Sequence, residues 1–267
     1  MYNENELVAV ALRNNLPSNA SILNFDRDPD RTSEKYRPTD DVAIVQTLNN
    51  MGWNITSYQQ RKAHDPSKSI YRKFLATYTN PTLPNIGEKG RVTIVERNSK
   101  DGVSSNEFFA GMDIFACLNG MIVGTQLFAP LKIRHKGNIP EELDRLVASL
   151  ADKLPIVGER VTQMSALRLT ESQCYEFARK AIELRFGEEN ANGVKPDDIL
   201  RARRNADNTQ SLWDTMNRLQ ENLFRPENLR FTRSDGKVTT ARRIRNIDVQ
   251  VKVNTGIWDL AETYLVQ

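Results

Sequence analysis

Arginines are the residues whose number and spacing most directly suggest a chemistry for this sequence. The stretch LRFTRSDGKVTTARRIRN, residues 229–246, contains six cations and a single acid, Asp235. Guanidinium and ammonium groups bind phosphates, and such contacts are independent of base sequence. The stretch is therefore a candidate for binding a nucleic-acid backbone. Its cations are Arg230, Arg233, Lys237, Arg242, Arg243 and Arg245.

The positive charge of the chain is concentrated around this stretch. The 267 residues carry a net charge of only +3. Residues 200–246 hold eleven Lys or Arg and five Asp or Glu, a balance of +6, so the rest of the chain sums to −3. An uneven distribution of this kind produces a directional field rather than a uniformly basic coat.

Further residues could complete a basic groove. The cluster RARR at 201–204 contributes Arg203 and Arg204, and Arg134 with Lys136 could form a third edge. Phe231 could act as a platform on which a base stacks, as aromatic residues do in proteins that bind single strands. A basic groove of this composition favours single-stranded DNA as the partner.

The simpler alternative is that these arginines form surface ion pairs. Asp207, Asp214 and Glu221 lie close in sequence to the two clusters. Exposed ion pairs contribute little to stability, so in that case the basic residues would have no measurable function. Charge alone does not separate this alternative from nucleic-acid binding.

Arrangements typical of enzymes are missing from the sequence. It contains no GxGxxG, GxxxxGK[ST] or GxSxG motif. Cys117, Cys174, His64 and His135 show none of the short spacings of zinc sites. Cys117 and His135 could form a nucleophile and its base, but Cys117 alternates with Phe115 in a strand-like segment, which favours a buried thiol. We expect no catalytic activity, no metal and no cofactor.

The sequence also indicates where the protein works. No run approaches the ~18 apolar residues of a membrane helix, and the polar N-terminus lacks the cationic region of a secretion signal. The two cysteines are far apart in apolar surroundings, as expected for reduced thiols. These features predict a cytoplasmic protein without a membrane partner.

The first half of the chain predicts a helix followed by antiparallel strands. Thr39 or Asp40 can cap a helix that ends at Gly52. Segments 54–60, 71–79, 91–97, 105–117 and 125–134 are rich in β-branched and aromatic residues, and turn sequences separate several of them. This order is typical of an antiparallel meander rather than of alternating strands and helices.

The second half predicts helices interrupted by a basic hairpin. Helical patterns cover 138–154, 170–187, 207–224 and 255–266. The second has a capping box of Thr170 and Gln173, and the third carries an apolar stripe of Leu212, Met216, Leu219 and Leu223. Around the turn Ser-Asp-Gly, apolar alternation runs from Leu229 to Ile244 and places Arg243 and Arg245 opposite Arg242. The sequence thus predicts an α+β protein with an N-terminal helix and linker (1–33), a sheet subdomain (34–137) and a helical subdomain with the basic hairpin (138–267).

Four motifs in one order carry a family resemblance. ERNSKDGVSSNEFFAGMDIFACLNGMIVG, IRHKG, LWDTMNRLQENL and TARRIRNIDVQVKVNTGIWDLAE resemble a family of phage, prophage and plasmid proteins catalogued as domain of unknown function number 932. The resemblance includes Arg243, and it implies a mobile-element origin in a bacterial cytoplasm. Members usually carry Gly-Gly after the QEN helix, where this chain reads RPENLRF.

A second resemblance is at the level of fold. A helix ending in Gly52–Trp53 and followed by a meander resembles the start of Rad52-type single-strand annealing proteins. That resemblance implies homo-oligomers that hold one DNA strand in a basic groove and act in recombination. The rival hypothesis is an accessory protein that binds and inhibits a host defence complex through the same basic face. Binding of single-stranded DNA is the function that we expect.

Overall fold

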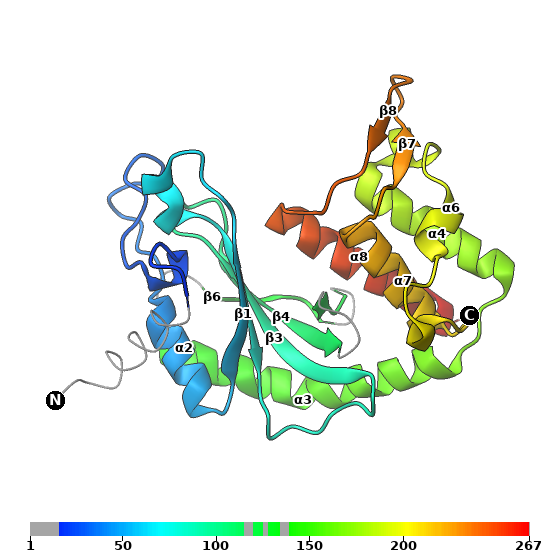
Figure 1. The fold of residues 1–267 in the computed structure, drawn as a ribbon. Helices are drawn as coiled ribbons and strands as arrows, with labels where there is room; N and C mark the ends of the chain where they lie inside the picture. Colours follow the sequence, from blue (N-terminus) through cyan, green and yellow to red (C-terminus); the bar gives the residue numbers. More distant parts are fainter. Residues whose placement is uncertain (1–15, 115–119, 125–127, 134–138, 267) are drawn as a thin grey trace. The chain divides into compact units, whose positions relative to one another are not determined.

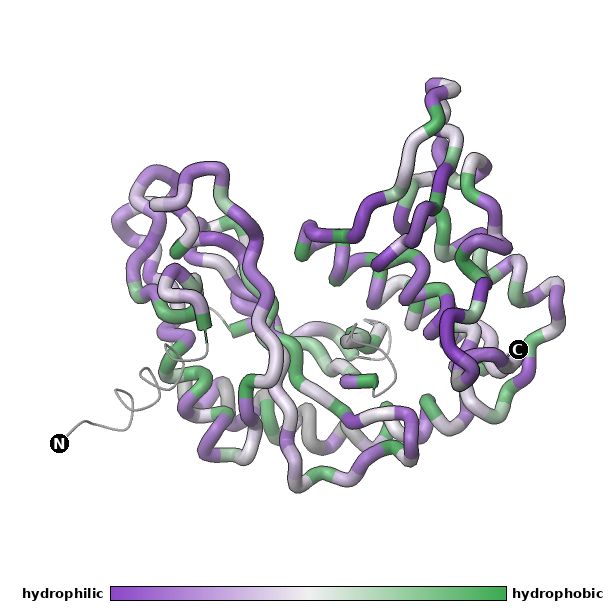
Figure 2. Tube along the Cα trace, viewed as in Figure 1, coloured by the Kyte–Doolittle hydropathy of each residue, from purple (hydrophilic) through white to green (hydrophobic). Residues whose placement is uncertain are grey.

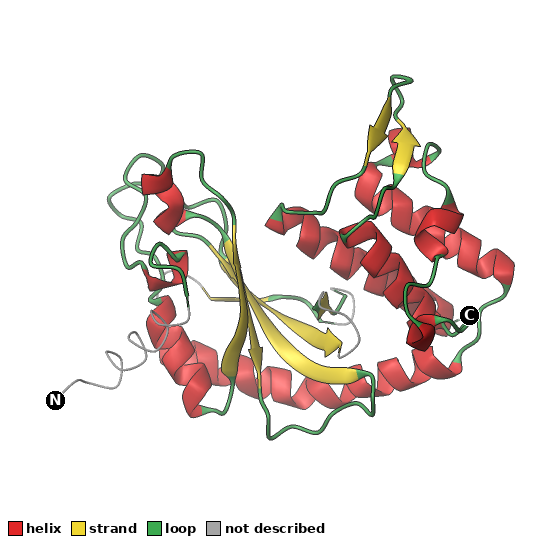
Figure 3. Ribbon diagram, viewed as in Figure 1, coloured by secondary structure: helices red, strands yellow, loops and turns green. Residues whose placement is uncertain are grey.

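The computed structural model describes residues 16–114, 120–124, 128–133 and 139–266, and it divides the chain into two compact units. Unit 1 consists of residues up to Asn85, Arg91–Gly111 and Pro130–Leu154. Unit 2 consists of Ile86–Gly90, Met112–Ala129 and residues from Pro155 onward. The fold is α+β, as predicted, with the strands of a meander before the helices (Figures 1 and 3).

The sheet follows the strand segments predicted from the sequence. β1 (Asn54–Gln60), β2 (Phe74–Thr79), β3 (Gly90–Asn98), β4 (Asn106–Ile114) and β5 (Met121–Ile122) are neighbours in that order, and β6 (Leu131–Ile133) pairs with β4. β1 pairs antiparallel with β2, and β2 with β3. The short strand β5 was not predicted, and the predicted strand 125–134 is reduced to β6 among the described residues. The apolar residues of β2, β3 and β4 form the core of unit 1.

Helix α2 (Asp41–Asn50) packs on β1 and begins as predicted. The Asp40 side chain accepts a hydrogen bond from the backbone N–H of Ala43, which satisfies one of the free donors of the first turn. Gly52 has φ +85°, a left-handed conformation that glycine adopts without strain, and it ends the helix before Trp53.

The ERNSKDG motif forms a buried polar network in unit 1, which we call the core network. The Lys100 Nζ lies 2.7 Å from Asp41 Oδ2, and both side chains are fully buried. Asn98 Nδ2 donates to Asp41 Oδ1 at 2.8 Å. Glu96, also fully buried, accepts from the Tyr78 hydroxyl at 2.6 Å and from Asn106 Nδ2 at 3.0 Å. The charged groups of this motif therefore find their partners inside the unit.

The segment predicted as a linker is irregular but fastened to the core network. Asp28 is buried, its N–H donates to the Lys100 carbonyl oxygen at 3.0 Å, and its carboxylate lies 3.3 Å from Lys68 Nζ. Arg31 and Arg72 both pair with the buried Asp101. These contacts hold residues 28–32 against unit 1.

Unit 2 is built from helices. They are α4 (Glu171–Phe186), α5 (Glu188–Ala191), α6 (Pro196–Leu200), α7 (Leu212–Phe224) and α8 (Ile247–Leu265), with the second half of α3 (Ile139–Ala166). The capping box of Thr170 and Gln173 begins α4 as predicted. α3 was predicted to end before Pro155 but continues to Ala166, because Val157, Val161 and Met164 extend its buried face.

The centre of unit 2 lies where α7 and α8 meet. Trp213 of α7 and Trp258 of α8 are buried edge to face, with ring centroids 6.3 Å apart. Gln220 Nε2 donates to Asn254 Oδ1 at 3.0 Å, which links the two helices through a buried hydrogen bond. The predicted apolar stripe of α7 is buried throughout. In the part of the chain that the structure describes, no helix is long and apolar enough to cross a membrane.

Candidate nucleic-acid interface

Residues 229–246, which we call the basic arm, form a hairpin and a loop between α7 and α8 (Figure 1). β7 (Arg230–Thr232) pairs antiparallel with β8 (Val238–Thr240). The turn is closed by a hydrogen bond from the Arg233 N–H to the Lys237 carbonyl oxygen at 2.9 Å, and Gly236 supplies the positive φ that it needs. The predicted basic hairpin is therefore present.

The hairpin is anchored to unit 2 on one side. The Phe231 ring packs on Phe186 of α4, with centroids 4.9 Å apart. The Ser234 N–H donates to Asn190 Oδ1 at 3.0 Å, and a Cβ on Gly193 would collide with the Thr232 carbonyl oxygen. Because Phe231 uses its ring to dock the hairpin, it is poorly placed to stack with a base as well.

The loop that follows β8 differs from the sequence prediction. Apolar alternation was predicted to continue to Ile244, but the strand ends at Thr240 (Figure 3). The buried residues are Ala241, Ile244 and Ile247, one in every three. The Ala241 N–H still donates to the Leu229 carbonyl oxygen in register with the hairpin, but the Ile244 N–H donates to the Phe224 carbonyl oxygen of α7, so the ladder does not continue and the alternation ends.

Because every third residue of this loop is buried, the two residues between successive buried residues are exposed to solvent. Arg242, Arg243 and Arg245 are consequently all exposed, whereas the alternating pattern would have placed Arg242 opposite the other two. Figure 2 shows this segment, just before α8, as hydrophilic. Arg230 is exposed as well. Among the residues that the structure describes, none of these four guanidinium groups has an ion-pair partner. Their charge is available to a ligand.

Arg185, which the sequence reasoning missed, lies beneath this loop. It donates to the Arg242 carbonyl oxygen, and its guanidinium lies 4.8 Å from the Phe186 ring centroid. Its Nη1 is buried without a hydrogen-bond partner in the described structure. Burial lowers the pKa of Arg185 to about 10, so it remains charged at neutral pH. No local signal marks Arg185, because its position under the arm depends on how α4 packs.

The turn of the hairpin is electrostatically different from the loop. Asp235 lies 3.8 Å from Arg233 and 3.8 Å from Lys237. The Lys237 side chain is 80% exposed. The single acid of the arm thus offsets charge at the turn and leaves the loop positive.

Arg203 and Arg204 are used to fasten the 201–207 segment to α7. The Arg203 guanidinium donates to Asn222 Oδ1 at 2.7 Å and to the Arg225 carbonyl oxygen at 2.8 Å, and it forms an ion pair with Glu227 at 3.2 Å. Arg204 lies 2.7 Å from Asp207 and 3.0 Å from Glu221. For these two residues the geometry favours the ion-pair alternative, and we regard them as structural.

Other candidates from the sequence lie outside the described residues. They are Arg134, Lys136, Cys117 and His135. Cys174 is described, and its thiol is buried in α4 with Sγ 3.9 Å from Thr215 Oγ1. The apolar surroundings expected for Cys174 are therefore present.

The loop between α7 and the arm explains how this chain departs from the family pattern. Asn228 has φ 56°, a left-handed conformation. Glycine is the usual residue at such a position, and Asn is among the few others that tolerate it. The chain can therefore make this turn without the Gly-Gly that the resemblance implies at this place.

The sequence comparisons place the chain in a family. Residues 30–256 match the family described as "Domain of unknown function (DUF932)", and the chain belongs to it. Two similar proteins come from Escherichia coli (strain K12). UPF0380 protein YfjQ is 28% identical over 253 residues, which are 92% of this chain and 88% of the relative. UPF0380 protein YafZ is 27% identical with the same coverage. No solved structure matches the chain.

Most residues that carry the family resemblance serve the fold. Asn98, Ser99 and Asp101 are buried in unit 1, and the α7 motif supplies Trp213 and Gln220 to the core of unit 2. Arg243 differs from them. Its side chain is charged, exposed and without an ion-pair partner among the described residues, as are those of its neighbours Arg242 and Arg245 in the same motif.

Proposed function

We propose that the protein binds single-stranded DNA through the phosphates, using the loop of the basic arm. The observation that carries the proposal is the side chain of Arg243, which is exposed and has no ion-pair partner in the part of the chain that the structure describes, at a position that belongs to the family resemblance. Arg242 and Arg245 flank it, and all three are exposed. A residue that serves the fold would be buried or paired, as the residues of the core network are.

Arg185 supports an anionic partner. It lies beneath the loop and remains charged at neutral pH, so it adds to the positive field of the loop. The partner is therefore recognised by its negative charge.

The arm is suited to phosphates rather than to bases. Phe231 packs on Phe186, so the aromatic ring predicted as a stacking platform is occupied. Phosphate contacts carry no sequence information, so binding through the arm is expected to be independent of base sequence. Annealing of strands by a homo-oligomer, in the bacterial cytoplasm and on behalf of a mobile element, is the extension of this proposal that the two resemblances suggest.

A salt titration of DNA binding tests the proposal. Anisotropy of a labelled oligothymidylate is measured against protein concentration at increasing salt. If three or four arginines each neutralise a phosphate, the log-log slope is roughly −2 to −3, from about −0.7 per phosphate on a single strand. Absence of binding at low salt, for protein that is shown to be folded, would remove the proposal. An acidic surface of a host defence protein would then be the partner to test.

A further inference from the structure

A hollow in unit 1 lies along β1. The residues that line it lie between 16 and 69, so none of them belongs to the basic arm. β1 pairs with β2 and with no other strand in the described chain. Its residues are exposed or half-buried, whereas those of β3 and β4 are almost all buried. The hollow has a volume of about 500 Å³. It is lined by β1, by residues within 16–19 that precede it in the chain, and by residues within 61–69 that follow it.

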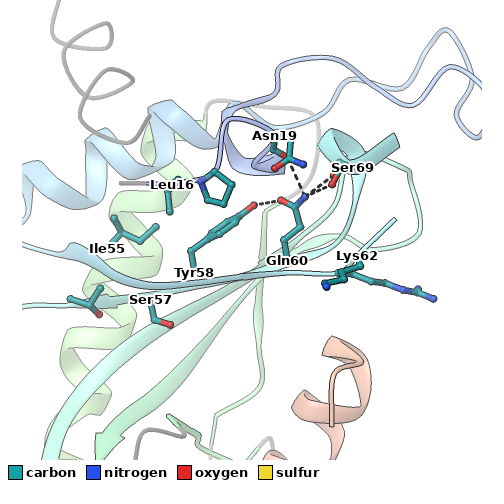
Figure 4. Close-up of a pocket in the computed structure, with 11 residues that line it drawn as sticks. Leu16, Asn19, Ile55, Ser57, Tyr58, Gln60, Lys62 and Ser69 are labelled. Atoms are coloured by element: carbon teal, nitrogen blue, oxygen red, sulfur yellow. Dashed lines mark hydrogen bonds between the residues drawn. The ribbon is translucent and has the colours of Figure 1, made fainter. Parts of the chain in front are cut away.

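The wall of the hollow is held in place by Gln60 (Figure 4). Its Nε2 donates to the Asn19 carbonyl oxygen at 3.2 Å and to the Ser69 carbonyl oxygen at 2.8 Å. Its Oε1 accepts from the Tyr58 hydroxyl at 2.6 Å and from the Ser21 N–H at 2.7 Å. One amide thus joins three separate segments, and the hollow is preformed rather than a gap between loose loops.

The lining changes in character along the strand. Leu16, Pro17 and Ile55 contribute apolar surface, and Tyr58, whose half-buried ring packs on Phe74 with centroids 5.5 Å apart, adds the part of its side chain that faces the hollow (Figure 4). Arg61 and Lys62 follow at the end of β1, where both are exposed. Neither side chain has an acidic partner among the described residues. The hollow therefore offers an apolar region with an aromatic residue and, next to it, two free cations.

We propose that this hollow binds a nucleotide, with the base and sugar along Leu16, Pro17 and Tyr58 and the phosphate at Arg61 and Lys62. The volume of about 500 Å³ is within the range of small-molecule sites. An aromatic ring with apolar neighbours suits a planar base of any identity, and the two cations match the charge of one phosphate. The nucleotide is either free or one unit of a DNA strand. The inference rests on unit 1 alone and does not depend on the arm.

Thymidine 5′-monophosphate is the probe that tests this site. Its binding to the full chain is measured by ligand-observed NMR, with thymidine and inorganic phosphate as separate partial probes. We expect the monophosphate to bind and each partial probe to bind at least about tenfold more weakly, because each has lost one half of the contacts. Equal binding of inorganic phosphate would overturn the role of the apolar wall.

Two variants and one control locate the binding. Arg61→Glu/Lys62→Glu removes the cations, and Leu16→Trp fills the apolar end. Both should abolish monophosphate binding. Lys35→Glu reverses another exposed lysine of unit 1 and should leave binding unchanged. Thermal unfolding checks each fold, and Lys62→Ala replaces the double variant if that variant unfolds early.

A photocrosslinking oligonucleotide separates the two sources of the nucleotide. With 4-thiothymidine in the strand, a crosslink to a peptide containing Tyr58 would show that the hollow takes a unit of DNA. Monophosphate binding without that crosslink would show a site for free nucleotides. No monophosphate binding and no crosslink would overturn the proposal, even if the arm binds DNA as proposed.

Discussion

The core network and the basic arm use charged residues in opposite ways. In the core network, Lys100 and Asp41 are fully buried and 2.7 Å apart, and Asn98 Nδ2 donates to Asp41 Oδ1. In the arm, Arg242, Arg243 and Arg245 are exposed and have no ion partner in the described chain. Charge that is buried must be paired to be tolerated, whereas charge left unpaired at a surface is free to meet a ligand. Both regions contribute residues to the family resemblance, yet the contacts assign them different roles.

Removing one member of the buried pair should have the largest effect on stability. Lys100→Met leaves the Asp41 carboxylate buried without its cation, which costs about 3 to 5 kcal/mol of the free energy of unfolding. Urea denaturation measures the loss. Lys35→Met, a change at an exposed lysine, is the control and should shift the midpoint little. Similar midpoints for the two variants would mean that the pair does not hold unit 1 together.

The pH dependence of stability should come in part from Glu96. Burial, and next the nearby Asp41 charge, raise the pKa of Glu96 from 4.5 to about 8. The folded state then holds a proton that the unfolded chain releases above about pH 4.5, so this group makes stability fall between pH 4.5 and 8. Glu96→Gln cannot ionise.

The Glu96→Gln variant should therefore lose that part of the pH dependence and exceed the wild type in stability at pH 8. Urea midpoints of both proteins across pH 5 to about 8 give the comparison. A constant difference between them at every pH would show that Glu96 does not titrate in this window.

Displacing the hairpin should have a smaller effect on stability and a visible one on binding. Gly193→Val forces the loop away from the Thr232 carbonyl oxygen, at a cost of about 1 to 3 kcal/mol. Because Phe231 and Ser234 would lose their anchors, oligothymidylate affinity should also fall. Asn192→Val changes the neighbouring exposed residue and should do neither. Unchanged DNA affinity in Gly193→Val would show that the docked hairpin does not position the loop.

The smallest effect is expected at Asn228. A β-branched residue is strained at φ 56°, so Asn228→Val should destabilise by about 1 to 2 kcal/mol. Asn228→Gly should be neutral within a few tenths of a kcal/mol, because glycine adopts this conformation freely. Thermal unfolding of the two variants distinguishes them. A greater loss for glycine would mean that the Asn side chain, and not the backbone conformation, is what the loop requires.

Local signals in the sequence predicted much of the fold. The caps of α2 and α4 and the apolar stripe of α7 depend on residues a few positions apart, and all were predicted correctly. The period-three loop at 241–247 depends on the hydrogen bond from the Ile244 N–H to the Phe224 carbonyl oxygen, and the position of Arg185 depends on how α4 packs. The ion pairs of Arg203 with Glu227 and of Arg204 with Glu221 could likewise be identified only from the tertiary structure. Composition identified the basic region, but it could not show which cations were already paired.

The contrast between loop and turn within the arm provides the most direct test of its proposed function. Arg243→Glu and Lys237→Glu make the same change in charge, the first at the unpaired loop and the second beside Asp235 at the turn. Oligothymidylate anisotropy at low salt should show at least about a tenfold loss of affinity for Arg243→Glu and a loss of about threefold or less for Lys237→Glu, with thermal unfolding unchanged in both. An equal or larger loss for Lys237→Glu would contradict the account, because the turn and not the loop would then bind the phosphates.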